Sequence, residues 1–132
     1  MKRQRGSMAV EIVILTPVFV LLLAFITYVT RVNMAQHELL RAADTAARAA
    51  SQARLTSMPQ RGAEAAYQSI REDVSHCVSF QAQVNRRSVG GILQVEVTTQ
   101  CRVNVLGLSL LGIRSPVLRA TSTEVVDVYR HP

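Results

Sequence analysis

The sequence predicts an α+β fold with a long N-terminal helix, a second short helix and a small antiparallel sheet of about three strands. Three observations support this prediction. An uncharged apolar block lies near the N-terminus, an Ala-rich stretch follows it, and the second half of the chain alternates between apolar and polar residues. Apolar residues that recur about every 3.6 positions are typical of helices, whereas strict alternation is typical of half-buried strands.

The apolar block spans residues 12–30 and reads IVILTPVFVLLLAFITYVT, between Glu11 and Arg31. As a helix it would be about 28 Å long, close to the roughly 30 Å hydrocarbon core of a bilayer. A cleaved secretory signal is the alternative, but this block is longer than the usual apolar region of such signals and no small-residue cleavage site follows. We therefore predict a single membrane span.

The basic residues at the N-terminus predict the orientation of this span. Three of them (Lys2, Arg3 and Arg5) lie in the first five positions, whereas Arg31 stands alone after the span. Short loops rich in Lys and Arg stay in the cytoplasm. We expect a single-pass protein of the cytoplasmic (inner) membrane, with its N-terminus inside and its C-terminus outside.

Pro17 interrupts the apolar block. Proline has no backbone N–H, so the carbonyl of Val13 loses its partner and a helix kink is expected. The neighbouring Thr16 hydroxyl is expected to satisfy part of this lost hydrogen bonding.

The Ala-rich stretch extends the first helix beyond the membrane. No Pro or Gly interrupts the chain before Pro59, and Ala is the best helix former. We predict one helix from Ser7 to Leu55, a break over Ser57–Gly62, and a second helix over Ala63–Val74. The expected apolar stripe of the first helix is narrow and consists of Leu39, Ala43, Ala46 and Ala50, flanked by Ala42 and Ala49.

Alternation then predicts strands over Val78–Val84, Leu93–Val105 and Val117–Tyr129. The even positions of the first and the odd positions of the second are apolar, which predicts a hairpin with one buried face. The turn is expected at Arg87–Gly91. The apolar loop Leu106–Ile113 is expected to pack on the core, with a contact surface for a membrane or partner as the alternative.

The two cysteines, Cys77 and Cys101, lie in the part of the chain that we place outside the cell. In that compartment a disulfide is the expected state, and two free thiols are the alternative. A hairpin with both apolar faces on one side requires paired residue numbers with an odd sum, whereas 77 and 101 have an even sum. Cys77 is therefore expected at the junction between helix and strand, outside the regular ladder.

Neither composition nor motifs indicate an enzyme or a nucleic-acid-binding protein. The 132 residues carry a formal net charge of +6, but their basic residues are scattered along the sequence. The chain contains no Trp, one of the aromatic residues on which the bases of single-stranded nucleic acids stack. His37, His76 and His131 are far apart in the sequence, and no Cys-x-x-Cys or phosphate-binding Gly-Lys motif occurs. We expect no catalytic residues, metal, cofactor, nucleic acid or small-molecule substrate.

The segment Arg5–Glu11, which reads RGSMAVE, precedes the apolar block, and Pro17 follows Glu11 by six positions. This arrangement resembles the prepilin processing site of the TadE-like family, minor pilins and pseudopilins of tight-adherence (Flp-type IV) pilus systems. The clear resemblance covers about residues 3–25. It implies that prepilin peptidase cuts after Gly6, that Ser7 becomes the new N-terminus, and that Glu11 pairs with an N-terminal amine.

The resemblance implies a pilin-like organisation for the whole chain. Residues 1–6 would be a cytoplasmic leader, residues 7–56 a helix with the span at 12–30 and a stalk at 31–56, and residues 57–132 an extracytoplasmic α+β domain. Its partners would be membrane lipid, prepilin peptidase, other pilin-like subunits and pilus assembly proteins. The expected function is assembly of a tight-adherence pilus at the cell surface or a related secretion filament.

Two alternatives lack filament assembly. One is an unprocessed, membrane-anchored binding module, and the other is a secreted protein released by signal peptidase. Gly6 and Glu11 discriminate between these functions, since a plain anchor needs neither of them.

Overall fold

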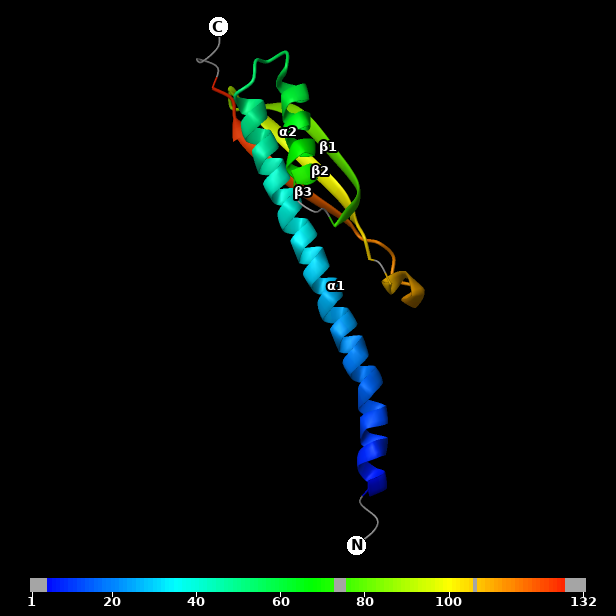
Figure 1. Cartoon of the computed structure of the whole chain (residues 1–132). Helices are drawn as coiled ribbons and strands as arrows, with labels where there is room; N and C mark the ends of the chain where they lie inside the picture. Colours follow the sequence, from blue (N-terminus) through cyan, green and yellow to red (C-terminus); the bar gives the residue numbers. More distant parts are fainter. Residues whose placement is uncertain (1–4, 73–75, 106, 128–132) are drawn as a thin grey trace.

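The fold is α+β, as the sequence predicts. The structure is a computed structural model that describes residues 5–72, 76–105 and 107–127. Its elements in chain order are α1 (Arg5–Ser51), α2 (Met58–Glu72), β1 (Cys77–Val89), β2 (Ile92–Val103), the 3₁₀ helix η1 (Leu108–Leu111) and β3 (Val117–Val125). The strands form one antiparallel sheet in the order β1-β2-β3. Figure 1 shows α1 as a long rod, with α2 and the sheet gathered along its C-terminal half.

Helix α1 starts and ends earlier than predicted, at Arg5 and Ser51 instead of Ser7 and Leu55. Its last turn tightens because the Ala53 amide bonds to the carbonyl of Ala50 rather than to one four residues back. The Ser51 hydroxyl donates to the Arg48 carbonyl at 2.9 Å, which offers the backbone an alternative to further helix.

The predicted stripe of α1 is the face that packs on the rest of the molecule. Leu39, Ala42, Ala43, Ala46 and Ala50 are fully buried, whereas Ala49 is half-buried. The buried face is wider than predicted, because it also includes Ala35 and Ala47. Small side chains on this face let the backbone of α1 lie close to its neighbours.

Helix α2 begins at Met58, so the predicted break over Ser57–Gly62 is wrong for most of its length. Pro59 is compatible with the first turn of a helix, where its missing N–H would have had no partner. Gly62 lies inside this helix, at a position where α1 and β1 approach closely. A Cβ on Gly62 would lie 2.9 Å from Cγ2 of Val84 and 3.1 Å from Cβ of Ala50.

Replacing Gly62 with leucine is expected to destabilise the protein by about 1–3 kcal/mol, because the added atoms must separate α1, α2 and β1. This cost opposes a gain in helix propensity of about 0.8 kcal/mol. Thermal unfolding in detergent micelles, followed by circular dichroism, should show a lower midpoint. Gln60→Leu, at an exposed position of the same helix, is the control. A midpoint for Gly62→Leu at or above the wild-type value would contradict the predicted close packing.

The residues paired in the hairpin have odd sums, as predicted, but the hairpin is longer than predicted. Phe80 lies opposite Cys101 and Val84 opposite Val97, so that the paired numbers have an odd sum. Strand β1 continues to Val89, and the turn is reduced to Gly90 and Gly91, with φ of 60° and 82°. Two successive residues with positive φ match the twist of the strands, and glycine adopts this conformation without strain.

A bulge near the start of β1 changes which side chains face α1. The register shifts between Cys77 and Ser79. Val78, predicted to be on the buried face, is instead 64% exposed, whereas Phe80, Ala82 and Val84 are half-buried as predicted. The extra residue moves Cys77 onto the same face as Phe80, since successive side chains of a regular strand point to opposite faces.

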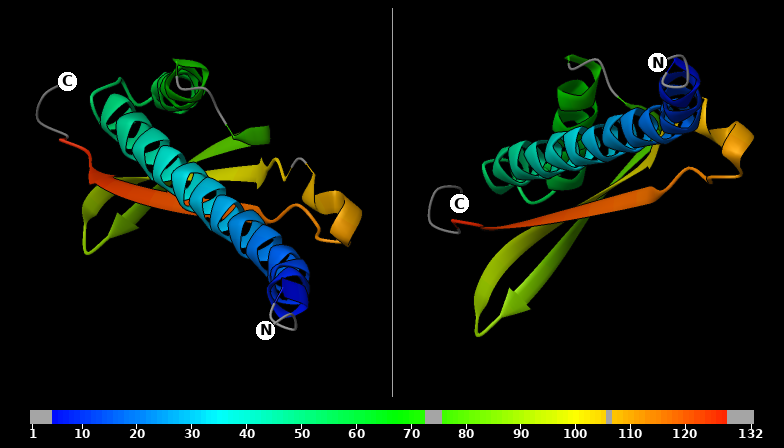
Figure 2. Two further views of the ribbon diagram at one scale, coloured as in Figure 1. Left: turned by 60° about the horizontal axis from the view of Figure 1, so that its bottom comes forward. Right: turned by 90° about the horizontal axis from the view of Figure 1, so that it is seen from below.

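Strand β3 ends at Val125, so Val126 and Asp127 of the predicted strand lie beyond it, and Tyr129 lies outside the described residues. Figure 2 shows both helices on one face of the sheet, with α1 crossing the strands diagonally. The larger core cluster lies between these two layers. It contains Ala46, Ala47, Ala50, Met58, Ala66, Val95, Val97 and Val126.

The loop between β2 and β3 differs from its prediction. Leu110 is 91% exposed and Ile113 is 37% exposed, so these two side chains do not pack on the core. Gly107 and Gly112 flank η1 with φ of 88° and 73°.

Candidate processing and assembly site

The residues of the predicted processing site lie in the first two turns of α1. Gly6 and Ser7 follow Arg5, where the helix begins, and Glu11 lies one turn after Ser7. Residues four positions apart share one face of a helix. Glu11 is exposed, and it takes part in none of the hydrogen bonds and ion pairs found among the described residues.

No part of the described chain covers the apolar half of α1. The large aliphatic and phenylalanine side chains from Val10 to Val29 are between 37% and 72% exposed. The helix is long and apolar enough to cross a membrane, with a mean hydropathy of 2.7 over its most apolar 18 residues. Thr16, Thr27 and Thr30 each donate a hydroxyl hydrogen bond to the carbonyl four residues earlier. Their polar groups are therefore satisfied within the helix, as a lipid environment requires.

Helix α1 continues through Pro17, and its N-terminal section bends away from the axis of the rest (Figures 1 and 2). A bend at proline is expected, since the ring clashes with the preceding turn. Thr16 donates at 2.7 Å to the carbonyl of Ile12 rather than to that of Val13, which is the group that Pro17 deprives of a donor. The predicted role of Thr16 in satisfying that group is therefore wrong.

Cys77 and Cys101 form a disulfide, with their Cα atoms 5.5 Å apart. This separation is typical of disulfides. Cys77 is the first residue of β1, as its predicted place between helix and strand requires, but it pairs with Val103 before the bulge instead of lying outside the ladder. Cys101 lies opposite Phe80 in β2. The pair packs in a second cluster with Leu39 of α1 and Ala120 of β3. The disulfide thus links the first residue of β1 to β2, next to α1.

Two polar contacts that the sequence did not indicate join α1 to the sheet. Nδ1 of His76 lies 3.3 Å from Oε1 of Glu38, and both side chains are largely buried. The fully buried Thr99 donates its hydroxyl hydrogen bond to the carbonyl of Leu39 at 3.0 Å. Glu38 and His76 are 38 positions apart, so no local pattern could have paired them. Both contacts stabilise the position of the sheet along the stalk half of α1.

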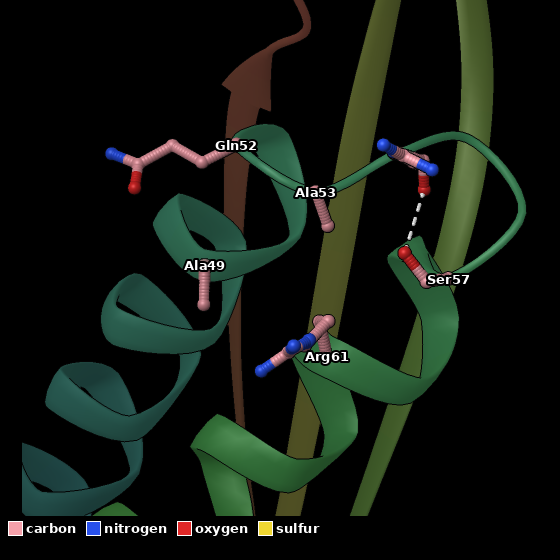
Figure 3. Close-up of a pocket in the computed structure, with 6 residues that line it drawn as sticks. Ala49, Gln52, Ala53, Ser57 and Arg61 are labelled. Carbon is pink, nitrogen blue, oxygen red and sulfur yellow. Dashed lines mark hydrogen bonds between the residues drawn. The ribbon is translucent and has the colours of Figure 1, made fainter.

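An open pocket lies at the far end of the molecule from the apolar span, where α1 turns into α2 (Figure 3). Ala49 and Ala53 contribute apolar surface, and Arg54 and Arg61 contribute positive charge. The Ser57 hydroxyl there donates to the carbonyl of Arg54. The lining residues include no acid, histidine or cysteine. Within residues 5–72, 76–105 and 107–127, there is no group of three or more His, Cys, Asp or Glu side chains that could hold a metal ion.

The predicted processing site, the uncovered apolar surface and the buried alanine face all belong to α1, and this helix also carries the similarity to known proteins. Residues 6–48 match the model of the TadE-like protein family. No curated protein and no solved structure matches the chain. The resemblance inferred from residues 3–25 is confirmed, and the TadE-like match extends further, through the stalk half of α1. The TadE-like family suggests a pilin-like protein associated with a Tad pilus. The role of that family is structural.

Proposed function

We propose that the chain is the precursor of a TadE-like minor pilin or pseudopilin. Prepilin peptidase cuts it after Gly6, and it then takes part in assembly of a tight-adherence pilus or a related secretion filament. One observation carries the proposal: a single helix joins the Gly6–Glu11 motif, an apolar surface that the described chain leaves uncovered, and a stalk on which the sheet packs. The same helix can be held by lipid before assembly and by other subunits afterwards.

The charges and the disulfide support the proposed orientation. Lys2, Arg3 and Arg5 would keep the short N-terminus in the cytoplasm. Disulfides persist in oxidising compartments, so the bond between Cys77 and Cys101 is consistent with a C-terminal domain outside the cell.

The position of Glu11 supports a role in assembly. A carboxylate at the edge of a bilayer costs less free energy when it is paired with a cation. Cleavage after Gly6 would create a cation at the Ser7 amine, which could meet Glu11 of the same helix or of a neighbouring subunit. Removing the leader would also lower the formal side-chain charge from +6 to +3, because it takes away Lys2, Arg3 and Arg5.

The first test is the N-terminal residue of the protein recovered from membranes of its own host. A chain that starts at Ser7 would establish processing of the prepilin type. A chain that starts at Met1 or Lys2 would contradict processing and favour the unprocessed binding module. A start beyond residue 30 would contradict both membrane functions, because the span itself would have been removed.

A further inference from the structure

The loop between β2 and β3 exposes apolar side chains without charge among them. Of the eight residues in the segment 106–113, five are Leu or Ile, two are Gly and one is Ser. Leu110, in η1, is 91% exposed, and it is the most exposed large apolar side chain of the described residues. The first charged residue after this segment is Arg114, which is also exposed. Such a segment is suited to burial in a lipid bilayer or against another protein molecule.

Contacts along the stalk show how far down α1 this loop lies. Arg48 lies 3.8 Å from Glu124, Ser122 donates to Asp44 at 3.3 Å, and Gln36 donates to the carbonyl of Arg119 at 3.3 Å. Strand β3 therefore runs in the same direction as α1, and its first residues lie nearest the apolar half of the helix.

The level of the loop follows from the rise of each element. A strand advances about 3.3 Å and a helix about 1.5 Å per residue. Val117, two positions before Arg119, therefore lies about four helix residues below Gln36, level with about residue 32 of α1. Figure 1 shows η1 projecting still further toward the N-terminal half of α1. The uncharged stretch of α1 ends at Thr30, so η1 is level with the outer end of the span.

We propose that the η1 loop inserts Leu110 and Ile113 into the outer leaflet of the bilayer that α1 crosses. This inference rests on the proposed function, since it requires α1 to span the membrane. Lipid is the fitting occupant because the exposed apolar side chains of the loop lie at the depth where the membrane crossed by α1 would end. The guanidinium of Arg114 would stay among the headgroups, where anionic lipids attract it. With two attachments to the bilayer, the sheet is held at one orientation until the subunit is extracted.

The absence of Trp from the chain makes single-Trp variants direct reporters of depth. We would place Leu110→Trp, Phe25→Trp and Val89→Trp separately in the full chain, reconstituted in vesicles of phosphatidylethanolamine and phosphatidylglycerol with and without brominated acyl chains. Phe25 is an exposed residue of the span, and Val89 is an exposed residue at the opposite end of the sheet. Brominated chains should quench Leu110→Trp and Phe25→Trp but leave Val89→Trp unchanged.

The possible outcomes distinguish failure of loop insertion from failure of membrane anchoring by α1. Quenching of Phe25→Trp alone would overturn loop insertion while α1 remains a membrane span. Absence of quenching in all three variants would contradict the proposed membrane anchoring itself. Shielding of Leu110→Trp from acrylamide without quenching by brominated lipid would indicate a second protein copy as the occupant, and it would overturn the inference.

Because Trp itself favours membrane interfaces, a second comparison removes its contribution. Ile113→Trp should be quenched when Leu110 is intact and should lose most of that quenching when Leu110→Asp is added. Equal quenching in both backgrounds would mean that the reporter, and not the native loop, inserts into lipid.

Discussion

Replacing Gly6 with valine is expected to leave the protein in the membrane as an uncleaved precursor. The valine side chain would have to fit where the peptidase accepts a residue without Cβ. Such overpacking costs about 1–3 kcal/mol, which slows cleavage roughly 5- to 150-fold. Insertion should be unaffected, because the apolar span begins at Ile12, beyond the substituted position.

The structure adds a second reason for this expectation. Gly6 lies in the first turn of α1, where the backbone N–H groups have no partner within the helix. Gly is also about 1 kcal/mol less favourable than Ala inside a helix. The first turn therefore opens readily, and a peptidase needs an extended segment rather than a closed helical turn. A residue with higher helix propensity would make this opening more costly.

The measurement is the intact mass of the protein purified from membranes, together with carbonate extraction to establish insertion. Ser7→Ala is the matched control, because it changes the adjacent position while keeping a small side chain, and it should be processed normally. Removal of residues 1–6 from Gly6→Val at the wild-type rate would contradict the proposed site. Loss of the protein from the membrane fraction would contradict the independence of insertion from processing.

Removing the disulfide with Cys77→Ser and Cys101→Ser is expected to have the largest effect on stability. The bond closes a loop with a sequence separation of 24. In the chain-entropy model, a loop of this size corresponds to about 3.5 kcal/mol. Both cysteines also belong to the cluster that contains Leu39 and Ala120, and hydroxyl groups at these positions would need hydrogen-bond partners. For a domain of this size, the thermal midpoint should fall by about 14–28 °C.

Thermal unfolding of the full chain in detergent micelles tests this prediction. Wild-type protein treated with a reductant should approach the midpoint of the double variant. Val78→Ser is the matched control, because Val78 is adjacent to Cys77 but its side chain is exposed. A double variant with the wild-type midpoint, together with no effect of the reductant, would show that the bond contributes nothing to stability.

The periodic features of this protein could be predicted from the sequence, because each depends on neighbours in the chain. The uncharged stretch at 12–30 has the length of a membrane span whatever follows it. The spacing of Leu39, Ala43, Ala46 and Ala50 determines one face of α1. Alternation in β2 determines which side chains are buried. The requirement for odd sums excluded the pairings that would put the two apolar faces on opposite sides, and the structure alone gave the register.

The candidate site divides in the same way. Gly6, Glu11 and Pro17 could be identified as a linear motif, because the proposed processing site is a short segment with few tertiary contacts. The pairing of Glu38 with His76 could not be predicted, since it depends on where the start of β1 meets α1. The same holds for the hydrogen bond from Thr99 to Leu39, which requires the sheet to be already packed on the helix.

Tertiary structure alone decided the exceptions to the local patterns. Gly62 indicates a break by composition, yet it lies within α2, where Ala50 and Val84 leave no space for the Cβ of any other residue. Val78 continues the alternation, yet a bulge exposes it and places Cys77 where it can reach Cys101. Leu110 has the composition of a core residue, yet it lies where no other element of the described chain covers it. Local patterns determine which face of an element is apolar, but the packing of distant elements determines what covers that face.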